Sequence, residues 1–168
     1  EGGCLPPPDA NKDAFISFCA GMAAEIRAVD PNHMVTAGII GTPVIELKNE
    51  NGNDEPARMY QNLDFITVHD YDSIVSTEKD LAARLNKPFL VEEAGRVNGR
   101  ADWFRGNMDF WFGAGADGYL GWGYMPTMTD NGDGDRDFGI DRVLHGDYDL
   151  VPQVWKDRAA PFGSPPAP

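Results

Sequence analysis

The sequence predicts an α/β fold with a parallel sheet, and three observations lead to it. Short apolar runs rich in β-branched and aromatic residues alternate with segments of helical periodicity, as in consecutive βαβ units. The run from Lys87 to Gly95 has a proline near its start and three apolar residues in its centre, which favours a buried parallel strand. The 168 residues are 42% hydrophobic and 11% aromatic, which suffices for one globular core.

The first expected helix runs from Asp13 to Val29. Its apolar residues recur at helical spacing, and Asp30-Pro31 ends the pattern. That stripe consists of Phe15, Phe18, Cys19, Met22, Ile26 and Val29. A strand is expected at about Met34 to Ile40, and we interpret the polar stretch from Glu46 to Arg58 that follows as a solvated loop.

Strands and helices then alternate to the end of the chain. The expected order is a strand at Leu63 to Asp72, a helix from Ser76, a strand at Lys87 to Gly95, a helix at Ala101 to Ala114, a strand at Gly118 to Tyr124 and a helix at Asp149 to Ala159. This alternation predicts neighbouring parallel strands joined by crossover helices.

Glu93 is the most informative candidate residue. It ends an apolar strand just before Gly95, where the chain can turn away sharply. Carboxylates at the carboxyl ends of barrel strands are placed for chemistry. Glu92 is expected on the opposite face, because successive strand residues alternate. A surface carboxylate at a strand end is the structural alternative.

The two flanking strands end in residues that suit a common site. His69 and Tyr71 are two residues apart, so they point to the same face of their strand and can both donate hydrogen bonds. Trp122 ends the strand that follows and offers both an apolar face and an N–H donor. A structural histidine and a core tryptophan are the alternatives.

Together these motifs resemble the last strands of retaining glycoside hydrolases with a (β/α)8 TIM barrel, especially the cellulases and mannanases of family 5 in clan A. The pattern Lys-Pro-(apolar)-Glu-x-Gly resembles their seventh strand, and the His-x-Tyr and Trp strands resemble the sixth and eighth. The resemblance spans about Asp13 to Ile140. It implies that residues 1–159 form the C-terminal half of a barrel, roughly strands five to eight with their helices, followed by a proline-rich tail or linker at 160–168.

By this resemblance, Glu93 is the nucleophile, His69 and Tyr71 line the sugar site, and Trp122 forms the floor of the subsite for the cleaved sugar. The family's general acid/base is a Glu at the end of strand four, usually after Asn. Here the chain opens on Glu1, so Glu1 is the candidate, because Asn49-Glu50 lies in the expected loop.

The resemblance implies a retaining hydrolase of a β-linked glycan or glycoside, working by double displacement between two carboxyl groups roughly 5 to 5.5 Å apart. A non-catalytic carbohydrate-binding or assembly domain is the alternative. His69, Asp70 and Asp72 leave a metal-dependent hydrolase as a third possibility.

No cofactor is expected, since phosphate-cradling, dinucleotide and zinc motifs are absent from the sequence. The segment after the Trp122 strand carries Asp133, Asp135 and Asp137, which supply the oxygen ligands that calcium prefers. A polar loop over the cleft is the alternative.

The composition of the chain limits which classes of partner it can bind. A net charge of -13 disfavours nucleic acid, which requires clustered Lys and Arg, and no apolar run approaches the roughly 20 residues of a membrane span. A half-barrel leaves sheet edges and apolar faces uncovered, so we expect an N-terminal half from the same precursor or another chain. Cys4 and Cys19 could form a disulfide or stay as two thiols; we expect a secreted or extracytoplasmic protein.

Overall fold

The computed structural model describes residues 12–38, 55–71, 77–96, 101–125, 140–141 and 150–162. Several predicted features lie outside these ranges: Glu1, Cys4, Asn49-Glu50, Asp72 and the acidic set Asp133, Asp135 and Asp137.

A parallel three-stranded sheet forms the centre of the fold. Its strands are β1 (Ile66–Asp70), β2 (Phe89–Ala94) and β3 (Gly118–Gly121), in that order. Helix α4 (Thr77–Leu85) connects β1 to β2, and α5 (Ala101–Gly113) connects β2 to β3. The predicted βαβ units are therefore confirmed.

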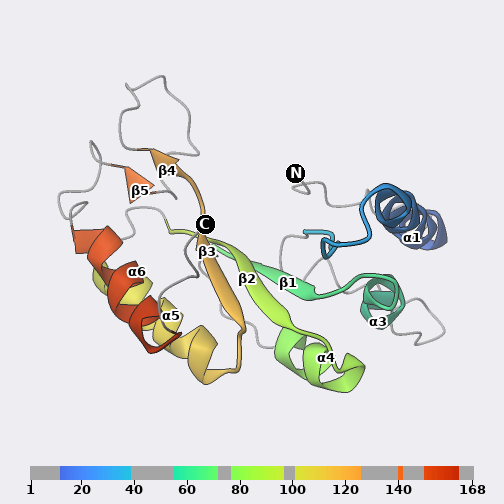
Figure 1. Ribbon diagram of the computed structural model, residues 1–168. Helices are drawn as coiled ribbons and strands as arrows, with labels where there is room; N and C mark the ends of the chain where they lie inside the picture. Colours follow the sequence, from blue (N-terminus) through green and yellow to red (C-terminus); the bar gives the residue numbers. More distant parts are fainter. Residues whose placement is uncertain are drawn as a thin grey trace.

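The helices surround this sheet on several sides. In Figure 1 they run from α1 (Lys12–Val29) and α3 (Glu55–Tyr60) on one side, through α4, to α5 and α6 (Val151–Ala159) on the other. Pro152 lies in the first turn of α6, where proline is tolerated, and a short 3-10 helix (Ala160–Phe162) follows. None of the helices in the described part of the chain is long and apolar enough to cross a bilayer.

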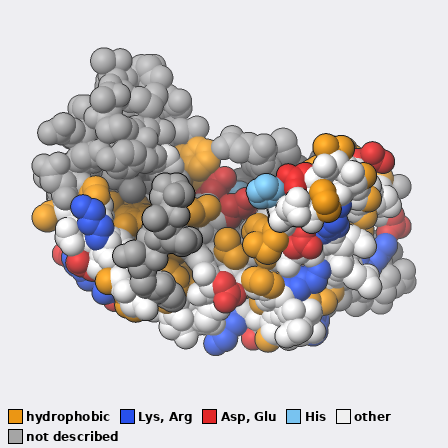
Figure 2. Space-filling model, in the orientation of Figure 1, with side chains coloured by type: hydrophobic (Ala, Val, Ile, Leu, Met, Phe, Trp, Pro, Cys, Tyr) orange, Lys and Arg blue, Asp and Glu red, His pale blue; other side chains and the backbone are white. Residues whose placement is uncertain are grey.

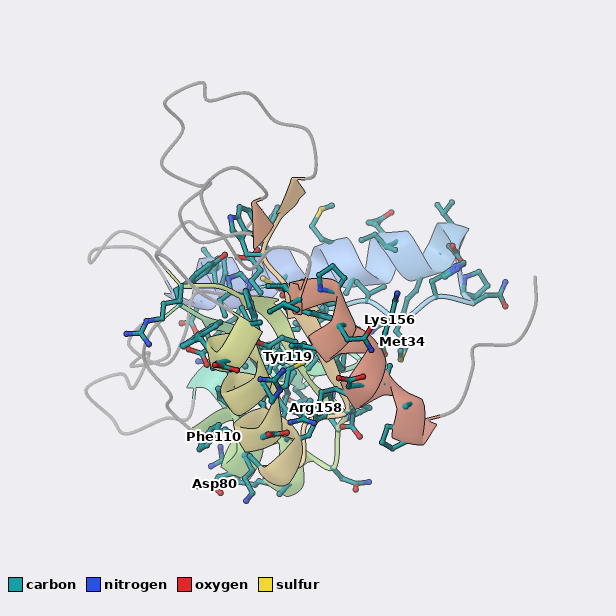
Figure 3. All side chains as sticks on the ribbon, turned by 90° about the vertical axis from the view of Figure 1, so that its left-hand side faces the viewer. Met34, Asp80, Phe110, Tyr119, Lys156 and Arg158 are labelled. Carbon is teal, nitrogen blue, oxygen red and sulfur yellow. The ribbon has the colours of Figure 1, made fainter. Side chains whose placement is uncertain are left out.

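The core lies between the sheet and helices α5 and α6. Phe89 of β2 meets Trp111 of α5 with ring centroids 5.6 Å apart, and both side chains are buried. Trp155 of α6 packs on Phe104 at 5.0 Å and on Tyr119 at 6.0 Å. Figure 3 shows Tyr119 of β3 where α5 and α6 meet. Aromatic packing on this side therefore holds β2 and β3 in place.

Part of the expected solvated loop is helical. α3 occupies Glu55–Tyr60, within the stretch from Glu46 to Arg58 and just beyond it, and Met59 and Tyr60 are only 1% and 0% exposed. The loop prediction was wrong there, because six residues are too few to show helical periodicity and only two of them are apolar and buried.

The segment at residues 34–38 runs beside β1 but forms no strand. The Val35 amide donates to the Asp64 carboxylate at 2.7 Å, and the Asp64 amide donates to the Val35 carbonyl at 2.8 Å. Thr36 donates its hydroxyl to the Phe65 carbonyl at 2.7 Å. The strand expected at Met34 to Ile40 was therefore wrong over its described part, because only one of these three hydrogen bonds joins backbone to backbone and side chains make the other two.

The strand expected at Gly118 to Tyr124 is broken. β3 ends at Gly121, and Gly123 has a φ of 57°, which interrupts the extended backbone. Beyond it, β4 (Tyr124–Met125) pairs in parallel with β5 (Ile140–Asp141), a short strand that the sequence did not predict.

Helix α1 is confirmed, but much of its apolar stripe faces solvent. Cys19 is buried, whereas Phe18 is 62% exposed, Met22 45% and Val29 87%. Cys19 is a free thiol, and its burial raises the pKa of the sulfhydryl. Phe18, Met22 and Val29 therefore form an exposed apolar face on α1.

Candidate functional site

A β-bulge in β2 shapes the site. β1 and β2 pair Val68 with Val91 and His69 with Glu93, so Glu92 is an extra residue opposite β1. The register of β2 against β3 slips over the same residues. A bulge bends its strand and redirects side chains. Strict alternation along the strand predicted that Glu92 and Glu93 lie on opposite faces. The bulge makes that prediction wrong, because both side chains approach the same histidine.

Both carboxylates approach the imidazole of His69, whose side chain is only 3% exposed. The Nε2 atom lies 3.3 Å from Glu92 Oε2, and Nδ1 lies 3.2 Å from Glu93 Oε2. The first contact has hydrogen-bond geometry. Nδ1 is buried and has no aligned hydrogen-bond partner in the described part of the chain. One imidazole thus separates two carboxylates.

Tyr71 makes the closest contact with Glu93, by donating its hydroxyl to Glu93 Oε2. Its ring stands edge-on to His69 at 6.4 Å and to Trp122 at 6.2 Å between centroids. The Trp122 amide donates to the Ala94 carbonyl at 2.8 Å, which ties the tryptophan to the end of β2. The four predicted residues, Glu93, His69, Tyr71 and Trp122, therefore meet at the carboxyl ends of three neighbouring strands.

Figure 2 shows acidic and hydrophobic side chains close together near the middle of the visible face of the molecule. Within the site, Glu92 is held ionised. The hydrogen bond with His69 is the main reason that the pKa of Glu92 lies below its ordinary value of 4.5; partial burial opposes this, and a Thr67 hydrogen bond adds to it. The site thus contains a fixed negative charge next to Glu93.

Asp70, one of the three residues of the metal-site alternative, does not join this group, and Asp72 lies outside the described residues. It is 1% exposed and accepts hydrogen bonds from Trp111 Nε1 at 2.6 Å and from Asn107 Nδ2 at 2.8 Å, both from α5. Tyr119 in turn donates to Asn107 Oδ1 at 2.6 Å. Asp70 therefore anchors α5 to β1, and the described residues contain no cluster suited to a metal ion.

Two residues of the site escaped the sequence analysis. Glu92 was read as facing away, and Gly38 carried no signal at all. A Cβ atom at Gly38 would fall 2.5 Å from Glu92 Oε2 and 3.1 Å from His69 Nε2. The doubled Glu before Ala94 was the only clue to Glu92, whereas Gly38 depends on a tertiary contact.

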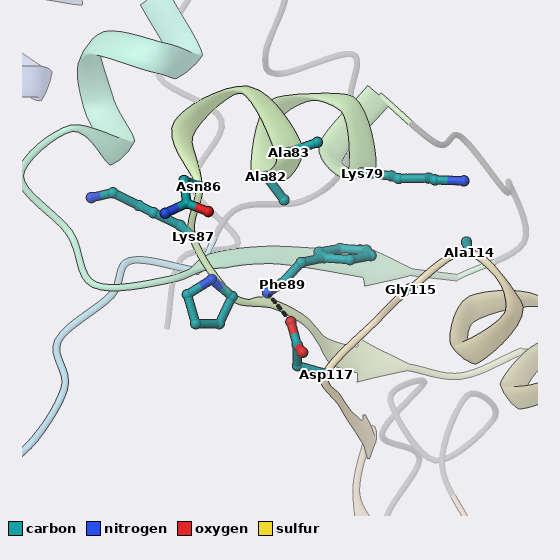
Figure 4. Close-up of a pocket in the computed structure, with 10 residues that line it drawn as sticks. Lys79, Ala82, Ala83, Asn86, Lys87, Phe89, Ala114, Gly115 and Asp117 are labelled. Atoms are coloured by element: carbon teal, nitrogen blue, oxygen red, sulfur yellow. Dashed lines mark hydrogen bonds between the residues drawn. The ribbon is translucent and has the colours of Figure 1, made fainter.

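The structure also has a pocket of about 480 Å³ at the other end of β2. Figure 4 shows its lining, with the Phe89 amide donating to Asp117 at 2.9 Å. Pro88 precedes β2 and Phe89 is its first residue, so this pocket lies at the amino end of the sheet. Barrel enzymes place their chemistry at the carboxyl ends. The candidate site is therefore the one around Glu93.

Comparison with known proteins supports the fold alone. No protein-family model and no curated protein matches the chain. It is similar to an endo-β-1,4-mannanase from Thermotoga petrophila, with a TM-score of 0.67 and 17% identity over 94% of this chain and 42% of that one. It is also similar to the structure of the hyperthermostable endo-1,4-β-D-mannanase from Thermotoga petrophila RKU-1 with maltose and glycerol. That comparison has a TM-score of 0.66 and 17% identity, over 95% of this chain and 55% of the other. The chain thus shares the fold of part of those two proteins and spans about half the length of those chains.

Proposed function

We propose that this chain carries the nucleophile half of a retaining glycoside hydrolase acting on a β-linked glycan. The observation that supports it most is the geometry of Glu93, whose Oε2 accepts from Tyr71 and lies 3.2 Å from His69 Nδ1. These contacts leave Oε1 without a hydrogen bond among the described residues. A carboxylate held by one oxygen with the other open suits attack on a carbon centre.

In the proposed reaction, Glu93 Oε1 attacks the anomeric carbon while the bond to the leaving oxygen breaks and a carboxylic acid protonates that oxygen. A glycosyl ester forms on Glu93. The same acid, now a carboxylate, takes a proton from a water molecule as that water attacks the anomeric carbon and the ester bond to Glu93 breaks, which releases the sugar with retained configuration. Tyr71 holds the carboxylate in position for the first step.

Glu1 remains the proposed acid/base, although it lies outside the described residues. Glu92 is the wrong group for that role. A general acid must hold its proton near neutral pH, whereas His69 keeps the pKa of Glu92 below its ordinary value. The second carboxyl group must therefore come from another strand.

The proposed substrate class is a neutral β-linked polysaccharide. Trp122 is half-buried beside Tyr71, so one part of its indole remains available to the C–H face of a sugar ring. The two similar solved structures are both endo-β-1,4-mannanases, so a β-1,4-mannan is the first substrate to test.

The rest of the barrel is the proposed partner, on the same polypeptide or another chain. Its strands would cover the apolar faces that this half leaves open and would support Glu1 in a position close to Glu93. Secretion and a calcium ion at Asp133, Asp135 and Asp137 stay as proposals that the described residues do not test.

A 2-deoxy-2-fluoro glycoside panel tests the function directly, because the fluorine slows release of the glycosyl ester. We expect one glycosyl adduct by intact mass, mapped to Glu93 by peptide sequencing. The Glu93→Gln variant should bind the glycan, show no adduct and lose nearly all turnover. Normal turnover in that variant would refute the assignment.

A carbohydrate-binding or assembly domain is the second candidate, because the chain spans only 42% and 55% of the two mannanase chains. Glycan binding with no adduct from any member of the panel, in the presence of the rest of the barrel, would favour it.

A further inference from the structure

Glu92 is an extra residue in β2 with an unusual environment. The bulge turns its side chain toward His69, and that side chain is only 32% exposed. A carboxylate at a strand end would ordinarily extend into solvent. Glu92 instead remains ionised next to the imidazole that also faces Glu93.

The chemistry of the contact fixes which nitrogen of His69 carries a proton. An ionised carboxylate only accepts hydrogen bonds, so Nε2 must be the donor to Glu92. This contact also fixes the rotation of the ring. The opposite nitrogen, Nδ1, then carries no proton and lies 3.2 Å from Glu93 Oε2 without a hydrogen bond to it.

Gly38 completes this arrangement from the neighbouring segment. Its missing side chain leaves the space that the Glu92 carboxylate fills, since a Cβ atom would lie 2.5 Å from Oε2. The segment is held against β1, because Thr67 donates its hydroxyl to the Ala37 carbonyl at 3.2 Å. Gly38 and Glu92 therefore fit each other.

We propose that Glu92 is a positioning residue, which fixes the orientation and tautomer of His69 and so keeps a proton off the nitrogen that faces Glu93, leaving Tyr71 as the donor to that carboxylate. The catalytic consequence of this inference rests on the proposed function. The coupling between Glu92 and His69 is independent of that function. Glu92 itself does not touch the reacting atoms.

The first test compares Glu92→Gln with the parent protein on aryl β-mannosides. Glutamine keeps the size of the side chain but removes the charge, and its amide can donate as well as accept, so it no longer fixes the tautomer. We expect kcat to fall by about 10- to 100-fold, as for a misplaced catalytic group, with KM within about twofold. A fall in kcat/KM that arises from KM alone would overturn the proposal.

Gly38→Ala reaches the same contact without changing Glu92. We expect a similar loss in kcat, and the double variant Gly38→Ala/Glu92→Gln should lose little more than either single variant, because both changes act on one contact. Multiplication of the two losses would contradict a shared mechanism. Gly21→Ala is the matched control, since nothing lies within 4 Å of a Cβ there, and its kcat should match the parent value.

A spectroscopic measurement keeps the test independent of turnover. The protein has three histidines, so the ring ¹⁵N signals of His69 can be assigned by its substitution with Gln. We expect the parent to carry a proton on Nε2, and Glu92→Gln to show a mixture of tautomers. An unchanged ¹⁵N pattern would refute the coupling. If the fluoro-glycosides label nothing while the tautomer shifts as expected, the proposed function fails and the coupling stands.

Discussion

At the scale of single residues, the hydroxyl of Tyr71 is the group that holds the candidate nucleophile. Tyr71→Phe removes the donor to Glu93 Oε2 but keeps the ring between His69 and Trp122. A hydrogen bond to a charged group contributes about 1.5 to 3 kcal/mol, so we expect a roughly 10- to 100-fold loss in kcat/KM, measured on aryl β-mannosides.

Tyr119→Phe is the matched control for this prediction. The Tyr119 hydroxyl is also buried and hydrogen-bonded, to Asn107, but on the side of the sheet that faces α5. This change should lower the free energy of unfolding and leave kcat/KM within about twofold of the parent value. If both variants lost activity equally, general destabilisation would explain the Tyr71 effect.

The carboxylates of Asp64 and Glu92 should make the free energy of unfolding depend on pH. The pKa of Asp64 lies below its ordinary 3.8, first because it accepts from the Val35 amide and then because of Arg27; the pKa of Glu92 lies below 4.5 for the reasons given above. A folded-state pKa that is lowered gives stability that is present above the unfolded value and lost as pH falls through the folded one.

We therefore expect the free energy of unfolding to fall as pH drops below about 4.5, the ordinary value for Glu92. Urea unfolding between pH 3 and pH 7 measures it. Asp64→Asn and Glu92→Gln should each be less stable than the parent at pH 7 and approach it in strong acid. A stability difference independent of pH would contradict this explanation.

The sequence could predict those residues of the site whose positions depend on their spacing within one strand. His69 and Tyr71 are two residues apart on one strand, and Glu93 precedes Gly95, so their placement followed from strand geometry. The bulge could not be read, because an extra residue leaves no pattern in the sequence. Glu92 was therefore assigned to the wrong face.

At the scale of elements, Lys87 joins β2 to the end of α3. Its Nζ donates to the carbonyls of Tyr60 at 2.6 Å, Gln61 at 3.1 Å and Leu63. Carbonyls at a helix end have no partner within the helix, and a cation there is favourable. One side chain thus fixes α3 against the start of the sheet.

Lys87→Met tests this link, because methionine retains an apolar stem but not the charge. Losing a charged donor to three carbonyls, two of them in part-buried hydrogen bonds, should cost about 2 kcal/mol, measured by urea unfolding. Lys79→Met, at an exposed position of α4, should change stability by less than about 0.5 kcal/mol. Equal effects from the two substitutions would indicate a general charge effect.

Element length decided which helices and strands could be predicted. α1 and α5 have 18 and 13 residues, enough for several turns of apolar periodicity, and both were found. α3 has six residues, and β5 has two. Such short elements depend on tertiary contacts, here the carbonyls bound by Lys87 and the pairing of β5 with β4.

At the scale of the whole molecule, the exposed face of α1 is where we expect the proposed rest of the barrel to pack. Phe18, Met22, Ile26 and Val29 are 42% to 87% exposed on one helix. The other side of α1 packs toward α3. Contiguous exposed apolar side chains mark interaction sites. Because the chain spans 42% and 55% of the similar mannanase chains, the remaining barrel is the partner we expect there.

The Phe18→Ser substitution tests whether the remaining barrel covers this face of α1 or leaves it exposed to solvent. With Phe18 62% exposed, the substitution should change the stability of this chain by less than about 0.5 kcal/mol. In the presence of a polypeptide that supplies the first four strands and the helices between them, the same substitution should cost about 1.5 to 3 kcal/mol, the value of burying a phenylalanine. Urea unfolding with and without that polypeptide measures both values, and Glu25→Ser on the same helix is the control. An identical effect in both conditions would place the remaining barrel elsewhere, because only a side chain buried by the partner gains from its presence.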